Sequence, residues 1–146
     1  MNKIELSILI ALHRNVNLID KKTMKLVGDN SLTLSQFMVL EALYSKGDMS
    51  IGQVMEKILS SVGTISLIVD NLVKLNLITK TANPKDRRIK ILSLTDKGYD
   101  LINRVAPMNE QLIIESMDKL SLSEKRELLT LLKKLYYSAS DDESIG

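Results

Sequence analysis

The sequence predicts a mainly α-helical fold that carries one small β-hairpin. With 6 Gly and 2 Pro among 146 residues, the chain has few residues that favour loops. Apolar residues recur at helical spacing through long stretches near both ends of the chain. Strand-like sequence occurs only around the turn-forming pair Asn83-Pro84. A chain of this length is expected to form one domain, which we assign to residues 1–146.

The first expected helix, residues 3–27, has a wider apolar face than one neighbouring helix can cover. Its apolar stripe includes Ile4, Ile8, Leu12, Val16, Ile19 and Val27. A first helix with so wide an apolar face often packs against more than its own domain. We therefore expect residues 3–27 and the helical residues 99–137 to form a helical dimerisation region and the protein to be a homodimer.

Three capping boxes mark the starts of later helices. Each pairs a Ser or Thr with a Gln or Glu three residues further on, so that each side chain bonds the backbone N–H of the other residue. The pairs are Thr33 with Gln36, Ser50 with Gln53, and Ser121 with Glu124. Gly47 is expected to stop the first of these helices, and Asn76 can adopt the left-handed conformation that ends a helix.

The second capping box opens a short helix, which a brief turn at residues 59–61 separates from a longer one. This spacing is typical of a helix-turn-helix. The longer helix has Val62, Ile65, Ile68, Val69, Leu72 and Leu75 at core spacing. Its other side includes Gly63, Ser66, Leu67, Asp70 and Lys74, with Thr64 and Asn71 flanking. Such a face is usually plain solvated surface, but the cationic hairpin that follows favours a contact with DNA.

The hairpin places Lys85, Arg87 and Arg88 within six residues. Residues 49–98 hold eight Lys or Arg against four Asp or Glu, whereas residues 99–146 hold six against nine. A cationic middle region is what a protein that faces phosphate would show. A helix suits the major groove, and the arginines of a hairpin suit phosphates and the minor groove. We therefore assign residues 33–95 to a winged helix-turn-helix module that binds double-stranded DNA.

Two helical segments follow the hairpin. Thr95 is expected to cap a long helix, and Pro107 should kink that helix or divide it. The last helix begins at the third capping box. Residues 138–146 are polar and acidic, and we expect them to form a disordered tail.

The composition excludes several classes of function. The absence of Cys removes disulfides, thiol nucleophiles and thiol redox sensing. A single His, His13, argues against a zinc site built from several histidines, and we expect no cofactor. No nucleophile motif or Gly-rich phosphate loop is present, so we do not expect an enzyme. No apolar run approaches the ~18 residues needed to cross a membrane, and no signal-peptide pattern is present. We expect a cytoplasmic protein.

The hairpin Asn-Pro-Lys-Asp-Arg-Arg at residues 83–88, followed by Leu92-x-Leu94-Thr95-x-x-Gly98, resembles the wing signature of the MarR family of bacterial transcription regulators. The similarity extends upstream through residues 68–72 and the Leu-Ile pair at 77–78, and it covers nearly the whole chain. The resemblance implies a dimeric winged-helix regulator of promoters. Members of this family are often released from DNA by small aromatic or phenolic ligands.

The resemblance also assigns roles to single residues. Arg88 matches the wing arginine that reaches the minor groove or bridges to the recognition helix, and Asp86 matches the acid that orients it. Asp70 matches a helix aspartate able to pair with Arg88, since a fixed carboxylate holds a guanidinium best. The alternative, in which Asp70 and Arg88 only brace the wing, stays open. Lys85 and Arg87 are expected to meet phosphate.

One residue departs from the family pattern. Leu67 stands where many relatives carry an arginine that touches the major groove, and it could contact only a thymine methyl. Readout by the wing and by DNA shape is therefore expected to matter more. The candidate DNA-contacting residues are Ser60, Ser61, Thr64, Ser66, Leu67, Asn71 and Lys74 on the helix and its turn, and Lys85, Arg87, Arg88 and Lys90 on the hairpin.

The function that we expect is a homodimeric, sequence-specific transcription regulator with a pseudo-palindromic operator, acting as a repressor that a small aromatic or phenolic ligand releases. The alternative is a winged-helix module that binds protein or structural DNA without ligand-controlled promoter regulation. His13 and Arg14 lie near where the ligand crevice of the family opens, and Arg14 could hold an aromatic carboxylate. A plain solvent or interface role for both residues is the competing interpretation.

Overall fold

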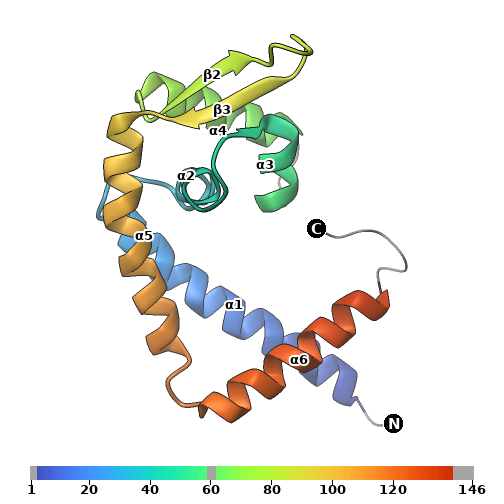
Figure 1. Ribbon diagram of the computed structural model, residues 1–146. Coiled ribbons are helices and arrows are strands. Elements are labelled where there is room, and N and C mark those ends of the chain that lie inside the picture. Colours follow the sequence, from blue (N-terminus) through green and yellow to red (C-terminus); the bar gives the residue numbers. More distant parts are fainter. Residues whose placement is uncertain (1–2, 59–61, 140–146) are drawn as a thin grey trace. The chain divides into compact units, whose positions relative to one another are not determined.

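The computed structural model describes residues 3–58 and 62–139, which form six helices and three short strands (Figure 1). In chain order these are α1 (Ile4–Gly28), α2 (Leu34–Lys46), β1 (Met49–Ser50), α3 (Ile51–Ile58), α4 (Val62–Lys74), β2 (Ile78–Ala82), β3 (Lys90–Leu94), α5 (Asp96–Ser116) and α6 (Leu122–Ala139). The predicted fold class, mainly α with a small β wing, is confirmed. The chain divides into two compact units, one ending at Leu112 and the other beginning at Ile113. None of the helices within the described ranges is long and apolar enough to span a membrane.

The core of the first unit is built from the end of α1, from α2, α3 and α4, from the sheet and from the first half of α5. Its buried apolar residues are Val27, Leu32, Phe37, Val39, Leu40, Leu43, Val54, Ile65, Ile68, Val69, Leu72, Leu77, Ile78, Leu92, Ile102 and Val105. Four of the six core positions predicted for α4 are therefore confirmed. Leu75 was wrongly placed in the core. It is 44% exposed because α4 ends at Lys74 and the chain turns away from the helical register there. The side chain of Val62 lies outside the described residues.

The sheet has three antiparallel strands in the order β1-β3-β2. Strands β2 and β3 form the predicted hairpin, with Ile78 opposite Leu94 and Ala82 opposite Lys90. Strand β1 was not predicted, because two residues are too few to show an alternating pattern. It pairs Met49 with Leu92, so the segment that precedes α3 is bonded directly to the wing.

All three predicted capping boxes form. Thr33 accepts the N–H of Gln36 through its hydroxyl oxygen at 3.1 Å and donates its own N–H to the Gln36 side chain at 2.9 Å. The same pair of bonds joins Ser50 to Gln53 and Ser121 to Glu124. Gly47, at the end of α2, has a φ of 84°, which favours glycine. These contacts fix where α2, α3 and α6 begin.

The end of α4 and the start of α5 share one hydrogen-bonded junction. Asn76 has a φ of 58°, as predicted for a residue that ends a helix, and the Leu77 N–H donates to the Leu72 carbonyl at 3.0 Å. Thr95 donates its hydroxyl to the Asn76 carbonyl at 2.7 Å and its N–H to the Leu77 carbonyl at 3.1 Å. The Thr95 hydroxyl in turn accepts the Gly98 N–H at 3.0 Å, so Thr95 caps α5 as predicted. We call Asn76, Leu77, Thr95 and Gly98 the α4–α5 junction.

The structure bears on two predictions about the C-terminal helices, since it excludes one of the two outcomes expected for Pro107 and corrects the end of α6. Pro107 does not divide the long helix, because α5 runs without a break from Asp96 to Ser116. Pro107 is exposed, so water can satisfy the single carbonyl that loses its helical hydrogen bond. Helix α6 extends to Ala139, two residues beyond the predicted end at 137. Residues 140–146 of the predicted tail lie outside the described residues.

Candidate DNA-binding surface

Helix α4 presents one face to solvent and buries the other. Ile65, Val69 and Leu72 are fully buried and hold the helix against the core. The predicted DNA-contacting residues of the described part of α4 are all exposed, namely Thr64, Ser66, Leu67, Asn71 and Lys74. Leu67 is 64% exposed on this face. Ser60 and Ser61 lie outside the described residues, as does the turn that precedes α4.

The tip of the wing is shaped by its own hydrogen bonds. The Asn83 side chain accepts the Lys85 N–H at 2.8 Å, and the Asn83 N–H donates to the Ile89 carbonyl at 2.8 Å. This local network closes the loop between β2 and β3 (Figure 1). Lys85 and Arg87 are exposed on the loop, and Lys90 is exposed at the start of β3. Together with Arg88, these residues make four cations that the wing presents to solvent.

Asp86 holds Arg88 in a forked contact. Arg88 donates from Nε to Asp86 Oδ1 at 3.1 Å and from Nη2 to Asp86 Oδ2 at 3.2 Å. The Arg88 backbone N–H also donates to Oδ1 at 3.1 Å. The side-chain bond from Arg88, with the backbone bond second, lowers the pKa of the Asp86 carboxyl from its ordinary value. The contact expected of an orienting acid is thus present, and the Arg88 side chain remains 91% exposed at the tip of the wing.

Asp70 does not pair with Arg88, contrary to the sequence-based assignment. Its Oδ1 lies 3.3 Å from Nζ of Lys80, which comes from the middle of β2. Arg88 is held at the wing tip by Asp86, whereas β2 packs directly against α4, so Lys80 is the cation that reaches Asp70. The sequence analysis missed Lys80. Its spacing of two from buried Ile78 could have placed it on the face of β2 that meets α4.

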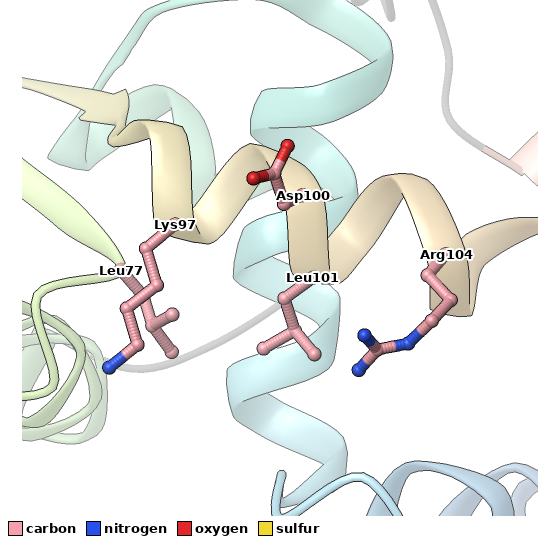
Figure 2. A pocket seen from close by; sticks show the side chains of 5 residues that line it. All are labelled: Leu77, Lys97, Asp100, Leu101 and Arg104. Atoms are coloured by element: carbon pink, nitrogen blue, oxygen red, sulfur yellow. The ribbon is translucent and has the colours of Figure 1, made fainter.

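His13 and Arg14 are exposed on α1 and do not line the cavity of about 520 Å³ beside α5. That cavity is lined by Leu77, Lys97, Asp100, Leu101 and Arg104 (Figure 2). The side chains of Lys97, Leu101 and Arg104 point to the same side of α5, with the leucine between the two cations. Lys97 donates to the Leu75 carbonyl at 3.1 Å, which ties this side of α5 to the end of α4. The sequence carries no motif for this site.

A helix-turn-helix whose second helix is exposed, with a cationic hairpin packed beside that helix, defines a winged helix-turn-helix DNA-binding protein. The model of the MarR family matches residues 32–90. The chain is 33% identical over 139 residues to the transcriptional regulator MhqR of Bacillus subtilis. The matched residues cover 95% of this chain and 96% of MhqR. The chain belongs to the MarR family of transcription regulators.

Two further relatives support this conclusion. The transcriptional repressor NicR of Pseudomonas putida is 33% identical over 118 residues, which cover 81% of this chain and 73% of that protein. A structure of Bordetella bronchiseptica BpsR, whose DNA binding is regulated by 6-hydroxynicotinic acid, superimposes with a TM-score of 0.80 at 25% identity. The superposition covers 90% of this chain and 99% of that one. The predicted family is therefore confirmed, and its members are DNA-binding regulators rather than enzymes.

Proposed function

We propose that the protein is a homodimeric, sequence-specific repressor that a small aromatic or phenolic ligand releases from its operator. The observation that carries the proposal is the exposed face of α4 beside a wing whose Arg88 is held in place by Asp86. A guanidinium held in a fork can contact DNA with little further loss of side-chain freedom. NicR is a repressor, and BpsR responds to an aromatic acid.

The proposed dimer uses the apolar surface of the flanking helices, residues 3–27 and 99–137. Eight large apolar residues of α1 are between 42% and 54% exposed in the single chain, namely Ile4, Leu6, Ile8, Leu9, Ile10, Val16, Leu18 and Met24. Leu128, Leu129, Leu131 and Leu135 of α6 are similarly exposed. Apolar surface of this extent normally meets a partner. Light scattering at micromolar concentration should give the mass of a dimer, and a well-folded monomer would contradict this.

In the proposed complex, the major groove takes up the exposed face of α4, with Thr64, Ser66, Leu67, Asn71 and Lys74. Ser60 and Ser61, the other two candidates for this contact, lie outside the described residues. Lys85, Arg87 and Lys90 contact phosphate, and Arg88 reaches the minor groove. Two such surfaces related by a two-fold axis would read half-sites about one helical turn apart. Selection of bound fragments from the genome of the source bacterium should therefore recover a pseudo-palindromic sequence. A regulator of this kind acts on the chromosome, in the cytoplasm.

The proposed effector is a small aromatic acid or phenol. Two locations offer a cation for its carboxylate: Arg14 with His13 on α1, and the cavity that Lys97 and Arg104 flank. A ligand that prefers the released form by about 1–3 kcal/mol would weaken operator binding ~5–150-fold. Operator affinity should be measured against a panel of hydroxylated aromatic acids, including 6-hydroxynicotinate, at fixed salt. The panel should then be repeated with Arg14→Ala and Arg104→Ala, since only the variant at the true site should lose the response.

A second candidate function is a winged-helix module that binds DNA without choosing a promoter. The observation that favours it is the chemistry of the α4 face, where hydroxyls and Leu67 discriminate weakly between bases. The genomic selection separates the two functions. Recovery of fragments without a shared sequence, together with equal affinity for any duplex, would support the second.

A further inference from the structure

One ion pair joins the recognition helix to the wing in the part of the chain that the structure describes. Lys80 Nζ lies 3.3 Å from Asp70 Oδ1. Asp70 comes from the exposed face of α4, and Lys80 comes from the centre of β2, where it stands opposite Leu92 of β3. Because α4 and β2 pack against each other, the pair links the two elements of the DNA-binding surface.

No other cation offsets the charge of Asp70 in the described structure. Arg88 is engaged by both carboxylate oxygens of Asp86. Lys74 stands one helical turn further along α4 but does not come within ion-pair distance of Asp70. Loss of Lys80 would therefore leave an unpaired carboxylate on the face of α4 that meets the duplex.

The pair is open to water in the protein without DNA. Its side chains are 37% exposed for Lys80 and 56% exposed for Asp70, and ion pairs this open to water stabilise a fold very little. A bound duplex changes the surroundings, because it displaces water and adds the negative charge of its phosphates. An unpaired carboxylate is repelled there, whereas a carboxylate neutralised by an ammonium group is not.

We propose that Lys80 is a positioning residue, which neutralises Asp70 and holds the wing against the recognition helix while both contact DNA. Lys80 acts through Asp70 and not as a direct phosphate contact, in keeping with its being the less exposed member of the pair. The inference rests on the DNA-binding role of this surface. The proposal gives a role to Lys80, a residue of β2 that lies outside both the recognition helix α4 and the tip of the wing.

A double-mutant cycle tests the proposal. Lys80→Met keeps the length of the side chain and removes the charge, and Asp70→Asn removes the carboxylate. Affinity is measured by fluorescence anisotropy for Lys80→Met, Asp70→Asn and the double variant. The probes are a duplex recovered by the genomic selection and a scrambled duplex of the same length. Lys80→Met should weaken binding roughly 3- to 30-fold in the parent and less than about twofold in the Asp70→Asn background.

The matched control is Lys85→Met on the wing loop. Lys85 forms no ion pair with a carboxylate of residues 3–58 or 62–139, so this change should cost the same in both backgrounds. If Lys80→Met also cost the same in both backgrounds, Lys80 would be an ordinary phosphate contact and the proposal would be wrong. It would be equally wrong if Lys80→Met bound as tightly as the parent. Should Lys80→Met fail to fold, a variant with the two residues exchanged, Asp70→Lys with Lys80→Asp, tests the same ion pair. That variant should bind better than Lys80→Asp alone, in which two carboxylates face each other.

The parent protein is measured first on both duplexes. Equal affinity for the two would refute the sequence-specific function proposed above. The cycle would still decide the role of Lys80, because it can be completed on either duplex.

Discussion

Replacement of Gly98 by alanine should destabilise the protein although it adds only one methyl group. A Cβ at position 98 would lie 1.9 Å from the Leu77 carbonyl oxygen and 2.9 Å from its carbon. Ordinary van der Waals contact begins at 3.4 Å, so the backbone of Leu77 would have to move away by roughly 1.5 Å. The atom in the way belongs to the backbone and cannot change its rotamer. The α4–α5 junction must therefore open.

The size of the loss in stability follows from the hydrogen bonds at the carbonyls of Leu77 and of its neighbour Asn76. Such a shift would break the 3.1 Å bond from the Thr95 N–H and strain the bond from the Thr95 hydroxyl to Asn76, at about 1 kcal/mol each. Displacement of the packed backbone costs a further 1–3 kcal/mol or so. Alanine returns about 1 kcal/mol because it favours the helix more than glycine does. The expected net loss is about 2–4 kcal/mol.

Thermal unfolding followed by circular dichroism measures this loss. Both proteins must be compared at one concentration, because the stability of a dimer depends on it. Gly98→Ala should melt about 6–16 °C below the parent. The matched control is Gly52→Ala in α3, where the nearest atom to an added Cβ is Ser50 Oγ at 3.9 Å and stability should be unchanged or slightly higher. Equal melting temperatures for Gly98→Ala and the parent would refute the argument from the close contact.

Three further predictions concern the wing and a helix start. Arg88→Ala should weaken binding to the selected operator by about 1–3 kcal/mol. Lys85→Ala should weaken binding to all DNA sequences alike and lower the salt dependence of binding by about one unit of slope. Both variants are titrated with DNA at several salt concentrations. The bonds from Arg88 lower the pKa of Asp86 from its ordinary 3.8, so the fork is present above that pH and is lost as pH falls through the lowered value. The Arg88 amide resonance should report this acid transition in NMR spectra, and Asp86→Asn should abolish it. Thr33→Ala removes the acceptor for the Gln36 N–H and should cost about 1 kcal/mol in urea denaturation, which an unchanged midpoint would contradict.

The helix starts could be predicted from the sequence because the contacts that make them are local. In each capping box the two partners stand three residues apart, so the pair Ser121–Glu124 forms whatever the rest of the chain does. Four of the six core positions of α4 were likewise set by helical periodicity. The prediction for Leu75 was wrong because periodicity does not show where a helix stops. Helix α4 already ends at Lys74, just before the left-handed residue Asn76.

The pairing of charges could not be predicted, since it depends on which strand packs against which helix. Asp70 and Lys80 are ten residues apart along the chain, and their contact exists only because β2 lies on α4. The contact between Asp86 and Arg88, by contrast, spans two residues and was correctly expected. Strand β1 was missed for a similar reason. Its two residues form a strand only because they pair with Leu92 and Ile91 of β3, which are distant in the sequence.

The α4–α5 junction also sets how the protein opens in its native state. The amide protons of Leu77, Thr95 and Gly98 are all hydrogen-bonded there. The Thr95 N–H donates to the carbonyl of Leu77, and the Gly98 N–H donates to the hydroxyl of Thr95, so the bonds share residues. We therefore expect these three amides to open for exchange with solvent deuterium together. The end of the recognition helix, the start of the wing and the first turn of α5 therefore form one cooperative unit for hydrogen exchange. A helix that reads DNA is thereby kept from fraying at the end from which the wing departs.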